Sequence, residues 1–257
     1  MIKFKIDFIG VGFGRSGSKW LVHCLYEHPE ISIPKFNLTT EINYFPEEHE
    51  VMGLKNYIKK FKNCDFRKKV GELSTLIIFE KRSAKLLKKL FSNVKIIIYR
   101  RDEEKRAESE YNIHKYSDLV KNVKKRIVNQ DELIEPFIKE FGRKNVHIFD
   151  MENKNKQQEL NKLFDFLEVK HLIPSCINKR FGSSYSYNKE GKKEIRGSRY
   201  PFVALVLNNV IKPFLRKHRK FYFTLKRSFN LDYYFQRYIN HKMRDRTVQD
   251  FNLEAKK

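Results

Sequence analysis

A strand, a glycine-rich loop and a helix are predicted at the start of the chain. Residues 8–11 (Phe-Ile-Gly-Val) are apolar and typical of a buried strand. Glycines and serines dominate residues 12–18, and residues 20–25 then place apolar side chains at helical spacing. Such a loop presents backbone N–H groups and the positive end of a helix dipole, so its natural ligand is an anion.

A second unit of the same kind begins at residue 94. Residues 94–99 form an apolar run typical of a buried strand, which ends in Arg100, Arg101 and Asp102. The charged residues 103–116 that follow predict a helix, on which Arg106 and Glu110 are interpreted as a helix-surface pair.

Shorter patterns complete an alternation of helices and buried strands. We predict helices at residues 57–61, 84–90 and 156–167, and strands at residues 70–73 and 145–150. This order predicts an α/β fold around a parallel sheet, whose ligands bind at the carboxyl ends of the strands.

The last quarter of the chain has a different character. Residues 181–199 are rich in Gly, Ser, Tyr and Lys and predict a long loop, and residues 196–257 hold 15 basic and 4 acidic residues. Apolar stripes at helical spacing follow, at Val203, Leu207, Ile211 and Leu215 and again from Leu225. We therefore predict a main domain at residues 1–200 and a basic, aromatic-rich helical extension at residues 201–257 that packs on it.

The composition of the chain limits the classes of molecule that it is expected to bind. The 257 residues are 40% hydrophobic, which excludes a wholly disordered chain, and 54 basic against 31 acidic residues give a net charge of +23. Such a charge favours a nucleic acid, a phosphorylated or sulfated small molecule, or an acidic membrane surface. Three separated cysteines, Cys24, Cys64 and Cys176, argue against a zinc site or a disulfide framework, and we expect a soluble protein of the reducing cytoplasm without a leader.

The first loop carries candidate anion ligands. Arg15, Ser18 and Lys19 add side-chain donors to its backbone amides, but Ser18 precedes Lys19, the reverse of the order that holds magnesium in a Walker A loop. On the loop alone, a structural turn and a phosphate cradle both remain open.

A family resemblance favours the cradle. Residues 15–21 (Arg-Ser-Gly-Ser-Lys-Trp-Leu) resemble the 5′-phosphosulfate-binding loop of sulfotransferases that use 3′-phosphoadenosine 5′-phosphosulfate (PAPS). Residues 101–111 resemble their 3′-phosphate motif, with Glu103 in place of its proline. The resemblance implies a P-loop-like, three-layer fold with a central parallel sheet flanked by helices, PAPS as donor, and no metal.

Two further segments are similar to the glycan-modifying branch of that family more than to the branch that acts on small phenols. Residues 41–45 look like its Glu-x-His-Phe-Phe segment, and residues 71–74 are similar to its Glu-Lys-Ser segment. The family's lysines in these segments are replaced by Thr40 and Leu73. The acceptor implied is a hydroxyl of a glycan or glycolipid.

The resemblance assigns roles to individual residues. Arg15 and Glu41 are the implied catalytic residues, Arg15 at the leaving phosphate and Glu41 as the general base. A solvated loop glutamate is the alternative for Glu41, and His23, His28, His49 and His114 are rival bases. The implied donor-binding residues are Arg15, Ser16, Gly17, Ser18, Lys19, Trp20, Arg101 and Ser109, and Lys192, Lys193 and Arg196-Gly197 are candidates to close over the nucleotide.

Two other functions compete. A P-loop kinase lacks support because the second strand ends in arginines where a magnesium-holding aspartate is expected. A nucleic-acid-binding module is favoured by the net charge and by aromatics interleaved with Lys and Arg in residues 217–238. We rank PAPS-dependent sulfuryl transfer first and regard nucleic acid as an unlikely partner. The basic segment at residues 216–220 is a candidate for peripheral contact with an anionic membrane.

Overall fold

The computed structural model describes residues 4–34, 41–114, 127–179, 181, 185–187, 193–195 and 217–228. The chain divides into two compact units, one of Met1–Arg106 with Ile127–Gly182 and one of Ala107–Arg126 with Ser183–Lys257. The predicted boundary at residue 200 lies outside the described residues. Within the described part of the chain, no helix is long and apolar enough to cross a membrane.

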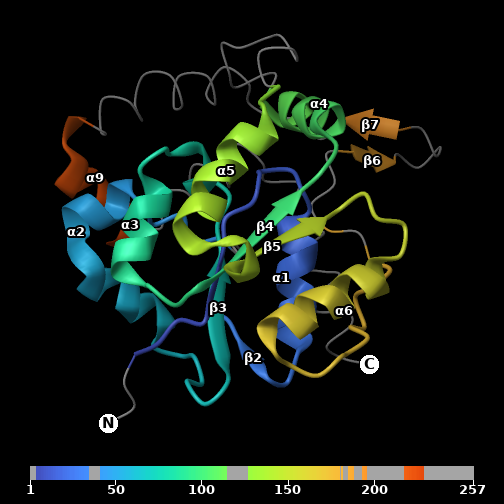
Figure 1. The fold of residues 1–257 in the computed structure, drawn as a ribbon. Helices are drawn as coiled ribbons and strands as arrows, with labels where there is room; N and C mark the ends of the chain where they lie inside the picture. The colour runs from blue at the N-terminus through green and yellow to red at the C-terminus, as the bar shows by residue number, and fades with distance from the viewer. Residues whose placement is uncertain are drawn as a thin grey trace. The chain divides into compact units, whose positions relative to one another are not determined.

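A parallel sheet of five strands forms the centre of the first unit (Figure 1). Its order is β2-β3-β1-β4-β5 and every pairing is parallel. The strands are β1 (Phe8–Gly10), β2 (Ile31–Ser32), β3 (Lys69–Leu73), β4 (Lys95–Arg100) and β5 (Val146–Asp150). Strands β1, β3, β4 and β5 confirm the predicted strands, and β1 lies between β3 and β4, which brings the two predicted motifs to neighbouring strands.

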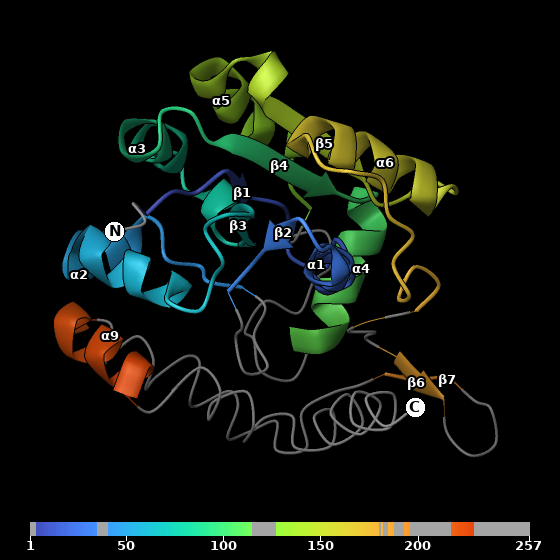
Figure 2. The ribbon, with the colours of Figure 1, turned by 90° about the horizontal axis from the view of Figure 1, so that it is seen from below.

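Helices cover both faces of this sheet, as the second view shows (Figure 2). On one face Ile9, Ile96 and Ile98 pack against α2 (Glu47–Ile58), η1 (Lys59–Phe61), α3 (Ser83–Leu90) and α5 (Gln130–Phe141). On the other face Phe8 and Ile97 pack against α1 (Ser18–Glu27) and α6 (Lys156–Leu167). The alternation of side chains along β1 and β4 therefore builds two apolar cores, and the predicted three-layer α/β fold is confirmed.

The second unit contains the later turns of α4 (Glu103–His114), an antiparallel pair of strands and a basic helix. Strands β6 (Tyr185–Tyr187) and β7 (Lys193–Ile195) pair within the segment predicted as a loop, so that prediction was wrong in part. The segment lacks the apolar alternation that marks a strand in sequence. Helix α9 (Arg219–Ser228) buries Tyr222 and Phe223, and the apolar stripe from Val203 to Leu215 lies outside the described residues.

Candidate active site

The loop between β1 and α1 is fixed by the neighbouring strand. Val11 N–H donates to Ile97 O at 2.9 Å and Phe13 N–H to Tyr99 O at 3.2 Å, so the loop starts as a continuation of the sheet. It then turns through Arg15, with φ at 67°, and Gly17, with φ at 74°. Both angles are in the left-handed region, where a side chain such as that of Arg15 is strained.

The end of the loop offers groups that suit an anion. Ser16 is buried, and its Oγ has no hydrogen-bond partner among the described residues. Gly17 caps α1 without a side-chain hydrogen bond, and the first turn of a helix carries N–H groups that lack intrahelical acceptors. An orphaned hydroxyl beside a helix N-terminus fits the phosphosulfate group that the loop is predicted to hold.

The predicted donor-binding side chains in the first turn of α1 differ in their exposure to solvent. Ser18 is buried, Lys19 reaches solvent, and the Trp20 indole donates to Ile177 O at 3.2 Å within the core. Trp20 can therefore offer an anion its backbone amide but not its ring. Crowding by protein atoms lowers the pKa of Lys19, the like charge of Arg15 lowers it further, and Glu41 opposes the shift.

Glu41 lies directly against this loop. It bridges to Leu73 at the carboxyl end of β3, and its Oε1 accepts a hydrogen bond from Ser18 Oγ at 2.8 Å. Its Oε2 accepts from Thr75 Oγ1 at 2.6 Å and from Asn43 Nδ2 at 3.2 Å. Three donors from separate segments thus hold one carboxylate at the loop, an arrangement that differs from a solvated loop glutamate.

A buried polar network lies behind Glu41. Ser74 Oγ accepts from Asn43 N–H at 2.9 Å and donates to Glu72 Oε2 at 2.7 Å, while Tyr57 OH donates to Glu72 Oε1 at 3.4 Å. Burial raises the pKa of Glu72 to about 7, although these two hydroxyls favour the charged form. Asn43, Ser74 and Thr75 were not predicted as separate site residues, because a polar residue beside a strand carries no sequence signal of what it contacts.

Arg101 follows the last residue of β4. Strand β4 pairs with β1, the strand that leads into the loop before α1. Its Nε donates to Glu152 Oε1 at 3.0 Å, and its carbonyl accepts from Gln130 Nε2 at 2.9 Å. The segment after β5 also reaches the loop, since Met151 lies where a side chain on Gly17 would have to fit, 2.3 Å from its Cβ position. Ser109 belongs to the second unit, where it is half-buried on α4.

Comparison with known proteins identifies the family. The family model for the sulfotransferase domain matches residues 5–247 of this chain. The chain belongs to the sulfotransferase family. It is therefore a PAPS-dependent enzyme that transfers a sulfuryl group to a hydroxyl-bearing acceptor. No curated protein matches this sulfotransferase in sequence.

Two solved structures share the sulfotransferase fold with this chain. A sulfotransferase from Alicyclobacillus acidocaldarius is 18% identical at a TM-score of 0.55, over 70% of this chain and 87% of its own. The sulfotransferase domain from the curacin biosynthetic pathway is 19% identical at a TM-score of 0.50, over 67% of this chain and 77% of its own. These likenesses agree with the P-loop-like, three-layer architecture described above.

The histidines predicted as alternative general bases lie in buried or partly buried surroundings where the structure describes their side chains. His28 is buried between Lys170 O and Glu30 N–H, His23 stacks on Phe181, and burial lowers the pKa of both His23 and His49. The side chains of His114 and Lys193, together with Lys192, Arg196 and Gly197, lie outside the described residues. Arg106, predicted on the helix surface, is 1% exposed and pairs with Glu103, so that prediction was wrong.

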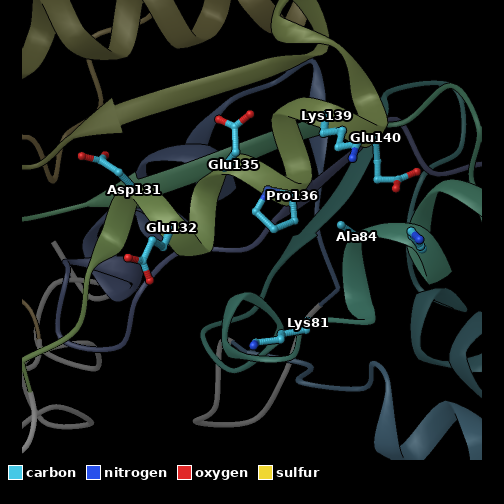
Figure 3. A pocket seen from close by; sticks show the side chains of 9 residues that line it. Lys81, Ala84, Asp131, Glu132, Glu135, Pro136, Lys139 and Glu140 are labelled. Atoms are coloured by element: carbon cyan, nitrogen blue, oxygen red, sulfur yellow. The ribbon is translucent and has the colours of Figure 1, made fainter.

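A pocket of about 620 Å³ opens elsewhere in the first unit, between α3 and α5 (Figure 3). Lys81, Asp131, Glu135 and Lys139 are among its lining residues, and none of the residues of the two motifs is. Among the described residues no group of three or more His, Cys, Asp or Glu side chains is placed to hold a metal ion.

Proposed function

We propose that this sulfotransferase acts on a hydroxyl of a glycan or glycolipid and that Glu41 is its general base. The observation that carries the proposal is the 2.8 Å hydrogen bond from Ser18 to Glu41, which holds a carboxylate at the donor-binding loop. A general base has to lie within hydrogen-bond reach of the proton it takes. His28 is hydrogen-bonded in the core and His23 is stacked on Phe181, which favours Glu41 over these two histidines.

The loop residues supply the remaining chemistry. PAPS, when bound, supplies a sulfuryl group that passes to the acceptor oxygen. Arg15 and Lys19 neutralise the charge that develops on the phosphate oxygen at the loop, a form of stabilisation that preorganised cations provide well. Asn43 and Thr75 orient Glu41 toward the acceptor proton. Arg101 holds the 3′-phosphate, a role that the family resemblance also implies for Ser109.

Apolar side chains beside Glu41 support an acceptor with an apolar face. Leu76 and Phe79 are 57% and 38% exposed, and Leu76 follows Thr75, which bonds to Glu41. The Phe79 ring lies 5.8 Å from that of Phe13 in the loop. A sugar ring presents C–H groups that pack on such side chains. The family's lysine in the Glu-Lys-Ser segment is Leu73 here, at the end of β3, and the loss of this positive charge favours an acceptor less anionic than a glycosaminoglycan.

One assay tests these roles together. The enzyme is given PAPS with a panel of glycans, glycolipids and small phenols. The sulfated product and PAP, the nucleotide left after sulfuryl transfer, are measured for the wild type, Glu41→Gln, Arg15→Ala and Phe79→Ala. We expect Glu41→Gln and Arg15→Ala to lower kcat by about 10²-fold or more, the range for losing a general base or a charge-stabilising group. Phe79→Ala should raise KM for the acceptor and leave PAP affinity unchanged.

The control is PAP affinity, which should persist in Glu41→Gln because this residue acts on the acceptor. Turnover of phenols alone would refute the glycan assignment. Wild-type turnover in Glu41→Gln would remove Glu41 as the base.

We also propose a peripheral contact of α9 with an anionic membrane, in the cytoplasm. Lys217, His218, Arg219 and Lys220 are exposed at its start, and Phe221 beside them is 56% exposed. Cationic side chains around an exposed aromatic ring are typical of helices that bind anionic lipid. The cytoplasmic location is part of the proposal and follows from the scarcity and spacing of cysteines in the sequence.

A further inference from the structure

Glu152 lies in the turn after β5, where two cations share its carboxylate. Arg101 Nε donates to Oε1 at 3.0 Å and Lys105 Nζ donates to Oε2 at 2.8 Å. Arg101 comes from the segment between β4 and α4, and Lys105 from the first turn of α4. Lys105 was not among the predicted site residues, because it lies outside the motif positions.

The cluster is electrostatically coupled. Partial burial raises the pKa of Glu152, but the hydrogen bonds from Lys105 and Arg101 outweigh it and hold the pKa below its usual value. The hydrogen bond to Glu152 in turn raises the pKa of Lys105. Lys156, whose amine donates to Met151 O, also interacts electrostatically with Glu152. The carboxylate therefore stays ionised among three cations.

The position of Glu152 is fixed by its own backbone. Its N–H donates to Asp150 Oδ1 at 2.8 Å, and the N–H of Met151 donates to Arg100 O at 2.9 Å. Met151 also lies against Gly17 at the end of the first loop. Glu152 is thus held at the carboxyl end of β5, beside both motifs.

This geometry is one that a phosphate requires. Arginine and lysine nitrogens bind phosphate and carboxylate oxygens at the same distances, about 2.7–2.9 Å. The side chains of Arg101, Glu152 and Lys105 are 31%, 35% and 57% exposed, so a solute can reach all three. The two cations hold an intramolecular anion where an external one can replace it.

We propose that Glu152 competes with the 3′-phosphate of the donor for Arg101 and Lys105, and that Lys105 is a second cationic ligand of that phosphate. The proposal rests on the role proposed above for Arg101. A nucleotide with a 3′-phosphate displaces the carboxylate and takes over both cations. A nucleotide with a 3′-hydroxyl does not displace the carboxylate, so Glu152 weakens binding only of nucleotides that carry a 3′-phosphate and reduces their advantage over nucleotides that lack it.

The test compares PAP with adenosine 5′-monophosphate (AMP), which lacks only the 3′-phosphate. Dissociation constants are measured by calorimetry at low salt for the full-length wild type, Glu152→Gln and Lys105→Met. We expect Glu152→Gln to bind PAP about 2–5-fold more tightly, the range for releasing an exposed ion pair, with AMP unchanged. Lys105→Met should weaken PAP by a similar factor and leave AMP unchanged.

Glu104→Gln is the matched control, since it removes an exposed acid from the turn of α4 that carries Lys105. It should leave the ratio of PAP to AMP affinity as in the wild type. Unchanged or weaker PAP binding by Glu152→Gln, or an equal gain for AMP, overturns the inference. Arg101→Ala separates the two levels: if it leaves PAP affinity unchanged, the role of Arg101 and this inference both fail, and if it weakens PAP while Glu152→Gln has no effect, only this inference fails.

Discussion

Hydroxyl and amide groups determine how the two acids near the loop are held. Ser74 is the branch point, because its Oγ donates to Glu72 and accepts from the N–H of Asn43. Asn43 then donates to Glu41 through its side-chain amide. The carbonyl of Ser74 in turn accepts from Tyr99 OH at 2.7 Å. A change at Glu72 is therefore transmitted to Glu41 through groups whose orientation is fixed by hydrogen bonds.

Glu72→Gln should change how stability depends on pH. Burial raises the pKa of Glu72 to about 7, Glu41 and Lys60 act on it in opposite directions, and Tyr57 bonds to it from α2. Between its ordinary value near 4.5 and about 7 the unfolded chain releases this proton while the native protein keeps it. The stability from this group is present below that window and is lost as the pH rises through it.

Urea unfolding of the wild type and Glu72→Gln at pH 5, 6, 7 and 8 measures this effect. The free energy of unfolding of the variant, relative to the wild type, should increase with pH across the series. Parallel pH profiles for the two proteins would mean that Glu72 is ionised throughout.

At the scale of elements, the loop after β1 packs against the ring of Tyr99 on the neighbouring strand β4. A Cβ at Gly12 would lie 2.1 Å from the ring of Tyr99 on β4, and the Tyr99 hydroxyl is bonded to Ser74 O. The ring is therefore held at both ends and has little room to move. Tight packing of the loop on β4 is what brings the first motif close to the second.

Gly12→Ala should destabilise the protein by about 1–3 kcal/mol, the cost of overpacking a well-filled core. Gly14→Ala is the matched control in the same loop, because a Cβ there meets nothing within 4 Å. Thermal and urea unfolding of both variants measures the difference. Equal stability of the two variants would show that Tyr99 moves aside without cost.

Regular elements were predictable where one physical signal dominated. The strands β4 and β5 and the helix α6 follow from their apolar patterns. The first motif follows β1 and the second follows β4. Most of α2 was not predicted, because Gly53, with φ at 69°, interrupts its helical repeat. Helix α5 carries Pro136 inside it and was likewise not predicted.

The candidate site was predictable as residues but not as contacts. Sequence indicated Ser18 and Glu41 separately, through the resemblance, whereas their hydrogen bond joins positions 23 residues apart. Glu152 has no motif around it, so its pairing with Arg101 follows only from the adjacency of β4 and β5 in the sheet. Long-range pairing of polar groups is set by topology, which no local pattern encodes.

At the scale of the whole molecule, the net charge of +23 raises the local concentration of anions near the surface. Such attraction acts on any anion and falls as salt screens it. A membrane contact by α9 would add a local component, because the exposed Lys217 and Lys220 come directly before the exposed Phe221 in the chain. Charge distributed over the surface and charge gathered on one helix therefore predict different responses to mutation.

Reversing the charges of α9 should reduce binding to anionic vesicles more than the same change elsewhere. The variant is Lys217→Glu with Arg219→Glu and Lys220→Glu, and the control reverses Lys81, Lys85 and Lys89, three exposed lysines in and before α3. Both variants lower the net charge equally. Sedimentation with phosphatidylserine vesicles over a salt series should show a loss of binding of about tenfold or more for α9, at about 1 kcal/mol for each basic residue at the surface, and a small loss for the control. Equal losses would assign the binding to net charge, and no binding of the wild type at low salt would refute the membrane contact.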